Sequence, residues 1–395
     1  MLKSNWILKL VVLSMSFVLL SATAAVGILP EIRDALGITQ TQSELLVTVP
    51  SIATLIFVML CDLFIDRIGM KKTVVVGLLL TGIGGVMPLL NATSYNYLLL
   101  SRFMFGAGKG LIFTPSVSYI NILFEERERA TLIGFRSAVE MLGQSLLTLV
   151  MGALVVFGWR FSFSVNGIFF LIVALILWKI PEVDANSNNK GSTESTHHAR
   201  IPLIVFPLAV FVGIVAISSS MIAIRFPALA TEIMGEGYNA SIWVGIKPLL
   251  GIIAASFFGK LSAVLGKKLL YIGTLLLISS QLLIGFSDGN FMILVIGFLL
   301  SAFVLGWIVP VIISTISKLT TGKQQRLASA SVLICANVGI FLMPFIVQAL
   351  EGIARSTELS APYPIAAGFV FALLVVVIIT SNSKSFRIKM GLENE

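Results

Sequence analysis

Long runs of apolar residues, separated by short polar segments, make up almost the whole chain. A helix needs about 20 residues to cross the hydrocarbon of a bilayer, and irregular backbone facing lipid would leave its polar groups unsatisfied. The expected fold class is therefore an all-α integral membrane protein. The pattern predicts twelve membrane-spanning helices, over residues 6–29, 44–64, 73–91, 97–123, 131–157, 162–180, 203–223, 241–259, 268–287, 291–316, 328–350 and 363–381.

Composition agrees with this pattern, because 57% of the residues are hydrophobic, 12% are charged and the mean hydropathy is +1.00. The first apolar run resembles a secretory signal, with Lys3 and Lys9 near its start and the small residues SATAA (21–25) near its end. Its apolar character continues through Leu29, which favours a retained helix.

The distribution of basic residues predicts the orientation. With the N-terminus inside, most of the 27 Lys and Arg residues fall in cytoplasmic segments, and four fall in external loops: Arg33, Arg160, Arg225 and Arg355. This positive-inside bias predicts that both termini are cytoplasmic. It also accounts for the net charge of +8, so no nucleic-acid partner is expected.

The chain has the pattern of two repeats joined by a linker. Residues 181–201 form a polar, low-complexity segment, which predicts a flexible cytoplasmic linker between six-helix bundles at 1–180 and 202–395. Three features recur at an offset of 196 residues, and they are Lys71-Lys72 with Lys267-Lys268, Gly110 with Gly306, and Gly143 with Gly339. Two parallel six-helix repeats are typical of an alternating-access transporter.

Two motifs make the resemblance specific. The segment DLFIDRIGMKK (62–72) resembles G-x-x-x-D-R-x-G-R-K-K, the loop signature of the major facilitator superfamily, and departs from it at Asp62 and Met70. The predicted fourth helix resembles the superfamily pattern R-x-x-x-G-x-G-x-G. The residues that match the two motifs are Asp66, Arg67, Gly69, Lys71, Lys72, Arg102, Gly106, Gly108 and Gly110.

The resemblance implies a cytoplasmic gate in which Asp66 contacts Arg326 just before helix eleven. The implied gate residues are Asp62, Asp66, Arg67, Gly69, Lys71, Lys72 and Arg326. The segment ILPEIRDALGI (28–38) resembles both the drug-proton antiporters and the cyanate-type branch, and leaves that choice open. Residues 140–154, EMLGQSLLTLVMGAL, lack the antiporter signature of the fifth helix.

Four cations lie within the predicted spans once Lys9, Lys179 and Lys268, at span ends, are assigned to the cytoplasmic segments. They are Arg102, Lys109, Arg136 and Lys247, and each should face the protein interior or a water-filled cavity, because exposure to lipid is costly. Arg102 and Lys109 are seven residues apart and share one helical face. The candidate substrate cavity consists of Arg102, Lys109, Lys247, Asn337 and Gln144. The alternative for Arg102 is a structural role as the centre, or hub, of a hydrogen-bond network. The alternative for Lys109 is that backbone carbonyl groups hold the cation.

Arg136 and Glu140 are the candidates for proton coupling. Their i, i+4 spacing on one helix allows a direct ion pair. Glu140 is the only carboxylate well inside the predicted spans, so a proton-driven mechanism has few other places to bind a proton. A purely structural pair is the alternative, since breaking a buried pair destabilises a fold whatever its function.

These features favour a proton-coupled exporter of a small amphipathic compound or metabolite, monomeric in the cell membrane, with a carrier of small organic or inorganic anions as the alternative. An enzyme is disfavoured, because Asp62 and Asp66 are the only acidic pair of interest and the chain has no H-E-x-x-H, G-x-S-x-G or P-loop motif. A channel suits the two repeats less well. No cofactor, disulfide or metal site is expected from Cys61, Cys335, His197 and His198.

Overall fold

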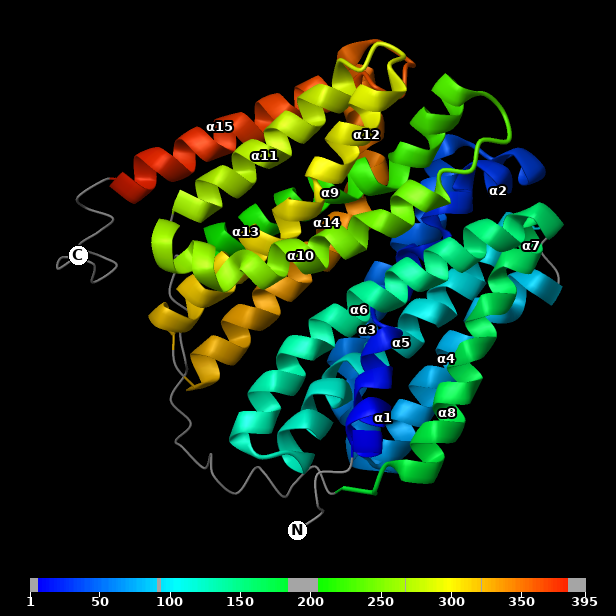
Figure 1. The fold of residues 1–395 in the computed structure, drawn as a ribbon, viewed down its shortest axis with the longest axis vertical. Helices are drawn as coiled ribbons and strands as arrows, with labels where there is room; N and C mark the ends of the chain where they lie inside the picture. The colour runs from blue at the N-terminus through cyan, green and yellow to red at the C-terminus, as the bar shows by residue number, and fades with distance from the viewer. Residues whose placement is uncertain (1–5, 91–93, 184–204, 267, 321, 383–395) are drawn as a thin grey trace. The chain divides into compact units, whose positions relative to one another are not determined.

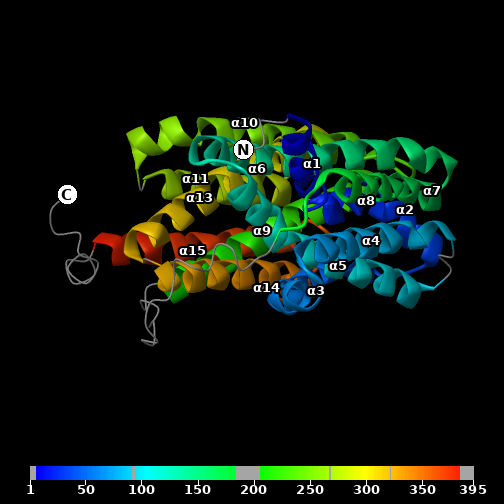
Figure 2. The same ribbon diagram turned by 90° about the horizontal axis from the view of Figure 1, so that it is seen from below.

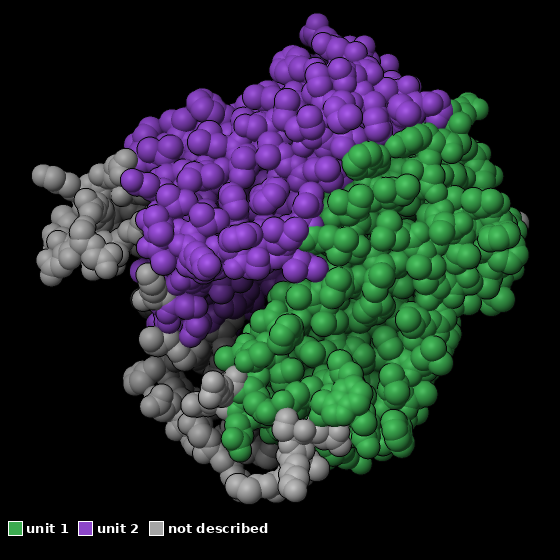
Figure 3. Space-filling model, in the orientation of Figure 1, with its two compact units in different colours: residues 1–197, 236–249 green, residues 198–235, 250–395 purple. Residues whose placement is uncertain are grey.

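The structure, a computed structural model, describes residues 6–90, 94–183, 205–266, 268–320 and 322–382. Most of the predicted linker, residues 184–201 with His197 and His198, lies outside the described residues. The chain forms two compact units, coloured separately in Figure 3. Unit 1 comprises residues 1–197 and 236–249, and unit 2 comprises residues 198–235 and 250–395. The predicted division into six-helix bundles at 1–180 and 202–395 stays a prediction.

Every regular element in the described part of the chain is helical, and Figure 1 labels the α-helices. The elements of the first half are α1 (Trp6–Phe17), η1 (Ser21–Ile28), α2 (Leu29–Leu36), α3 (Gln40–Ile68), α4 (Met70–Leu90), α5 (Tyr95–Leu123), α6 (Glu126–Leu154), η2 (Val155–Phe157), α7 (Trp159–Ser162), η3 (Phe163–Gly167) and α8 (Ile168–Lys179). Those of the second half are α9 (Val205–Met234), α10 (Ser241–Leu265), α11 (Lys268–Gly285), α12 (Phe291–Leu300), α13 (Ala302–Leu319), α14 (Gly322–Ala354) and α15 (Pro362–Asn382).

The membrane character of the fold is confirmed. In the described residues, ten helices are long and apolar enough to cross a membrane, and an eleventh span results if the bent pair Trp6–Phe17 and Ser21–Leu36 is counted as one. The 29-residue helix α5 is also long enough but is not among them. Twelve spans, and the cytoplasmic location of the termini, stay predictions.

The first span is broken. Helix α1 ends at Phe17, and after a bend of 51° the chain continues as the 3₁₀-helix η1. The hydroxyls of Ser21 and Thr23 donate to the carbonyl oxygens of Val18 and Leu20, at 2.5 and 2.8 Å. These bonds satisfy acceptors at a break where the regular i to i−4 ladder is interrupted.

Glycines bring α5 into backbone contact with two neighbouring helices, and Figure 2 shows α4 and α5 side by side. A Cβ on Gly106 would collide with the backbone of Pro50 in α3, and one on Gly110 would lie 2.6 Å from the carbonyl oxygen of Thr54. A Cβ on Gly108 would collide with the carbonyl oxygen of Gly77 in α4. Small residues allow such close packing where helix association has no hydrophobic driving force. The G-x-G-x-G motif thus allows α5 to pack closely against α3 on one side and α4 on another.

The 196-residue offset recurs in the packing within each unit. In unit 1, Gly143 of α6 contacts the carbonyl oxygen of Phe17, where a Cβ would collide. In unit 2, a Cβ on Gly339 of α14 would lie 2.6 Å from the carbonyl oxygen of Gly213. Both members of the second pair are 196 residues beyond those of the first. The predicted repeat is therefore present in the helix contacts.

A polar contact repeats at the same offset with its donor and acceptor exchanged. In unit 1, the hydroxyl of Ser101 donates to the carbonyl oxygen of Gly84 at 2.6 Å. In unit 2, the hydroxyl of Ser280, which corresponds to Gly84, donates to the carbonyl oxygen of Gly297, which corresponds to Ser101, also at 2.6 Å. The same two helices are joined at the same level in each repeat, although the serine has changed sides.

Two glycines of α6 provide a matched test of this packing. We expect Gly143→Ala to destabilise the fold by about 1–3 kcal/mol, because the new methyl group must displace the backbone of α1. Gly134→Ala should be neutral or stabilising by up to about 1 kcal/mol, since its Cβ meets no atom within 4 Å and alanine favours a helix. Thermal unfolding of the detergent-purified variants measures both. Equal melting temperatures for the two variants would contradict the assigned contact.

Candidate functional site

Three charged side chains gather between α5 and α6, and we name Lys109, Arg136 and Glu140 the α5–α6 charge cluster. An Nη2 atom of Arg136 lies 3.0 Å from Oε1 of Glu140, and the two side chains are 14% and 15% exposed. Lys109 interacts electrostatically with Glu140. The predicted i, i+4 ion pair is therefore present, with a second cation beside it.

Helical spacing explains why these groups meet. In α5, Lys109, Phe113 and Ser116 follow i, i+4, i+7 spacing and so form one stripe. The Nε–H of Arg136 points to the Ser116 hydroxyl at 3.4 Å, and its guanidinium carbon lies 5.3 Å from the centroid of the Phe113 ring. Arg136 thus contacts the stripe near one end, while Glu140 interacts with it near the other. The two helices face each other in antiparallel directions.

Gln144 extends the polar face of α6 by one turn. It is partly exposed and stands four residues after Glu140, next to Gly143, which contacts Phe17 at the break of the first span. A polar side chain beside a broken helix is the kind of place where membrane transporters bind substrates. The predicted cavity role of Gln144 stays a prediction.

Lys247 lies in the part of α10 that belongs to unit 1. The Ser145 hydroxyl of α6 donates to the carbonyl oxygen of Gly245 at 2.6 Å, and a Cβ on Gly245 would lie 2.6 Å from Cγ of Leu149. This contact brings the segment that carries Lys247 and Pro248 next to the α6 turn after Glu140. Lys247 is partly exposed, and its role as a cavity cation stays a prediction.

Arg102 is held by the protein itself. Its side chain is 3% exposed, and an Nη2 atom donates to the carbonyl oxygen of Gly84 at 2.9 Å and to the Ser101 hydroxyl at 3.1 Å. The guanidinium carbon lies 5.1 and 4.9 Å from the ring centroids of Phe105 and Phe163. This geometry favours the structural hub over a substrate contact.

The remaining predicted cavity residue, Asn337, lies in unit 2. Its amide donates to the carbonyl oxygen of Leu333, one turn earlier in α14, at 2.9 Å. The side chain is partly exposed and so keeps an accessible face. Its role in a substrate cavity stays a prediction.

The loop motif forms the junction of α3 and α4. Gly69 has φ +88° and ψ 157°, a conformation that favours glycine, and its N–H donates to the carbonyl oxygen of Ile65 at 2.9 Å. Lys71 donates to the carbonyl oxygen of Leu177, near the end of α8, at 3.1 Å, which suits a cation at a helix C-terminus. The motif residues with exposed side chains are Asp62, Asp66, Arg67 and Lys72.

The predicted gate contact between Asp66 and Arg326 stays a prediction. Arg326 lies within α14, where its side chain is outside the described part of the chain, and Asp66 belongs to the other unit.

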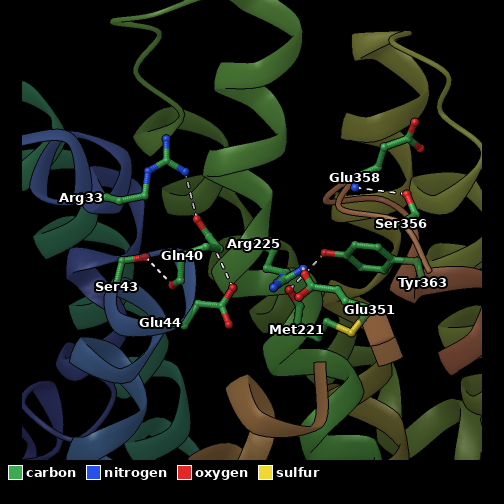
Figure 4. Close-up of polar contacts among 10 residues, drawn as sticks. All are labelled: Arg33, Gln40, Ser43, Glu44, Met221, Arg225, Glu351, Ser356, Glu358 and Tyr363. Atoms are coloured by element: carbon green, nitrogen blue, oxygen red, sulfur yellow. Dashed lines mark hydrogen bonds and ion pairs between the residues drawn. The ribbon is translucent and has the colours of Figure 1, made fainter. Parts of the chain in front are cut away.

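Sequence reasoning missed a buried ion pair in unit 2. Arg225 was expected in an external loop, but it lies inside α9 with 1% of its side chain exposed, and its Nη1 is 2.7 Å from Oε1 of Glu351 in α14 (Figure 4). The apolar residues on both sides of Arg225 continue the helix to Met234 and were the available signal.

A second miss lies in unit 1. Glu44 of α3 is fully buried and accepts from the Gln40 amide at 2.9 Å, while Gln40 accepts from Arg33 at 3.0 Å (Figure 4). Glu44 is thus more deeply buried than Glu140, but it lies near the start of α3, so the expectation that Glu140 is the only carboxylate well inside the predicted spans stays a prediction. Glu44 was the first residue of the predicted span 44–64, whereas α3 begins four residues earlier, at Gln40.

An all-helical membrane fold with an internal repeat and charged side chains held inside it is typical of secondary transporters. The chain belongs to the Major Facilitator Superfamily, whose family model matches residues 11–263. The hexuronate transporter of Bacillus subtilis (strain 168) is 26% identical over 281 residues, which are 65% of this chain and 66% of that relative's length.

Solved structures show the same fold over nearly the whole chain. The inward-open xylose transporter XylE from E. coli has a TM-score of 0.72 at 16% identity, covering 93% of this chain and 94% of that one. The nucleoside transporter NupG has a TM-score of 0.74 at 14% identity, covering 94% and 99%. The predicted major facilitator fold is thereby confirmed, whereas the resemblance to the drug-proton antiporter and cyanate-type branches stays a prediction.

Arg102 offers a test of the hub. We expect Arg102→Ala to lower the free energy of unfolding by about 1–3 kcal/mol, because it removes a buried donor and two ring contacts. Transport per folded molecule should be retained in part. Thermal unfolding and transport, normalised to the folded fraction, separate the two effects. A variant of unchanged stability that transports nothing would instead assign Arg102 to the substrate route.

Proposed function

We propose that this protein is a secondary active transporter of small organic anions, monomeric in the cell membrane, in which residues 1–180 rock against residues 202–395. The observation that carries the substrate class is the composition of the α5–α6 charge cluster, in which two cations share one carboxylate. With Glu140 ionised the cluster has a net charge of about +1, and charge complementarity then favours an anion.

The similarity to a hexuronate transporter supports the same substrate class, because a hexuronate is an organic anion with several hydroxyl groups. Lys109 and Arg136 would bind the carboxylate, Arg136 through a bidentate geometry that a guanidinium provides. The amide of Gln144 and the polar break after Phe17 would be suited to hydroxyl groups. Lys247, on the adjoining part of α10, would add positive charge to the same region.

Proton-coupled export of a small amphipathic compound is the second candidate. It is favoured by the Phe113 ring in the cluster, which would suit a cationic or apolar group, and by Glu140 as a carboxylate that a cation and a proton could share. Aromatic side chains are common on lipid-facing and interior surfaces alike, so this observation distinguishes the candidates less well than the charge balance does.

The two candidates predict different responses in proteoliposomes that contain a pH-sensitive dye. We expect organic anions, such as glucuronate and gluconate, to trigger proton movement or to be taken up, and amphipathic cations to do neither. Proton movement triggered by cations alone would support the exporter. Transport of neither class would contradict both.

Lys109 tests whether the cluster binds the substrate. We expect Lys109→Ala to raise the KM for the transported anion about tenfold, equivalent to about 1.4 kcal/mol of lost binding. The control is Lys260→Ala, which removes an exposed lysine of α10 and should leave the KM unchanged. An unchanged KM in Lys109→Ala would exclude Lys109 from the substrate site.

A further inference from the structure

The two cations that an anionic substrate would need, Arg136 and Lys109, already interact with Glu140. Its Oε1 is 3.0 Å from Arg136, and it interacts electrostatically with Lys109. A substrate carboxylate that reached the same two cations would stand beside a second carboxylate, and two like charges at such a distance repel each other strongly in a low-dielectric site. Either Glu140 or the substrate must lose its negative charge.

We infer that Glu140 is an internal counter-anion that the substrate carboxylate replaces when Glu140 becomes protonated, so that one proton and one anion are bound and carried together. The inference rests on the proposed anion transport and adds the direction of coupling. Protonation takes the cluster from a net charge of about +1 to about +2, and the anion restores it. No group changes covalently, since only a proton is bound and released.

Charged residues on the elements packed around Glu140 come from α6 itself, α5, α1 and α10. On its own helix Arg136 forms an ion pair with it, and Lys109 of α5 interacts with it electrostatically. The described part of α1, packed on α6 at Gly143, carries one charged residue, Lys9, and this lysine forms an ion pair with Glu128 at 2.7 Å, three turns earlier in α6. The charged residue of α10 nearest to its contact with α6 is Lys247.

Arg136 has contacts that do not depend on Glu140. Its Nε–H points to the Ser116 hydroxyl, and its guanidinium lies over the Phe113 ring. Ser116 is itself fixed, because its hydroxyl donates to the carbonyl oxygen of Phe113 at 2.7 Å. Neutralising Glu140 therefore frees one side of Arg136 without releasing the side chain from its position, and the cation stays ready for an incoming carboxylate.

Symport and antiport differ in whether a proton bound to Glu140 strengthens or weakens substrate binding. If a proton on Glu140 strengthens anion binding, anion binding must strengthen proton binding by the same factor. The two ligands then cross in the same direction. An exported cation would have the opposite relation to Glu140, because it would bind to the ionised carboxylate and would compete with the proton. The cluster, with one carboxylate and two cations, fits the first relation.

The decisive variant is Glu140→Gln, which mimics the protonated carboxyl group. Binding of radiolabelled glucuronate, gluconate and lactate to purified protein is measured at pH 6 and pH 8. We expect wild-type affinity to fall as the pH rises. Glu140→Gln should bind about tenfold more tightly than wild type at pH 8, the factor equivalent to one pKa unit, and should show no pH dependence. In proteoliposomes it should keep anion exchange and lose accumulation driven by a proton gradient.

The matched control is Glu128→Gln, on the same helix and also paired with a lysine. It should retain the wild-type pH dependence. As a measurement that needs no variant, addition of the anion to weakly buffered wild-type protein should take up about one proton per anion bound, as the stated linkage requires.

The outcomes distinguish the two levels of the proposal. If wild-type protein binds none of these anions at either pH, the proposed anion transport fails, and the inference fails with it. If wild-type protein binds an anion equally at both pH values with no proton uptake, or if Glu140→Gln keeps the wild-type pH dependence, anion transport stands and the role assigned to Glu140 is wrong.

Discussion

Backbone contact between α5 and its two neighbours is the constraint on which unit 1 depends. Gly106 and Gly110 press one side of α5 against α3, and Gly108 presses another side against α4. With both sides fixed at this distance, α5 cannot rotate, and the stripe of Lys109, Phe113 and Ser116 must face α6. The position of a charged cluster in the membrane is thus determined by residues that have no side chain, because close packing replaces the hydrophobic effect between helices in lipid.

The same need to satisfy polar groups internally appears in both units, in different forms. In unit 1, Arg102 has no described carboxylate partner and is held by a carbonyl oxygen, a hydroxyl and two aromatic rings. In unit 2, Arg225 is more deeply buried and is paired with Glu351. The first arrangement surrounds the cation with neutral groups, whereas the second places a carboxylate beside it. Two arginines with similar burial therefore impose different conditions on their surroundings.

Much of the fold follows from the sequence, because apolar length, the repeat offset and helical spacing are local properties of the chain. The pairing of Arg136 with Glu140 could be predicted in the same way, because the two residues are four positions apart on one helix. The hub at Arg102 could not be found in this way, since Gly84 is 18 residues away on another helix and accepts through its backbone. Arg225 and Glu44 were missed for a common reason. A charged residue was taken to end a helix, whereas its side chain is buried and the helix continues past it.

The modest hydropathy of α5 has a consequence for synthesis of the protein. A segment enters the bilayer from the translocon according to its own apolar character, and Arg and Lys near its centre oppose entry. α5 carries both Arg102 and Lys109. It is not among the helices that are apolar enough to cross a membrane, whereas its neighbours α3 and α4 are. Its insertion is expected to depend on α3 and α4, which precede it and offer the carbonyl groups and close surfaces that it needs. The helix that carries the G-x-G-x-G motif is thus not among those apolar enough to cross a membrane alone, and its order of synthesis, after its two partners, becomes part of how the protein is made.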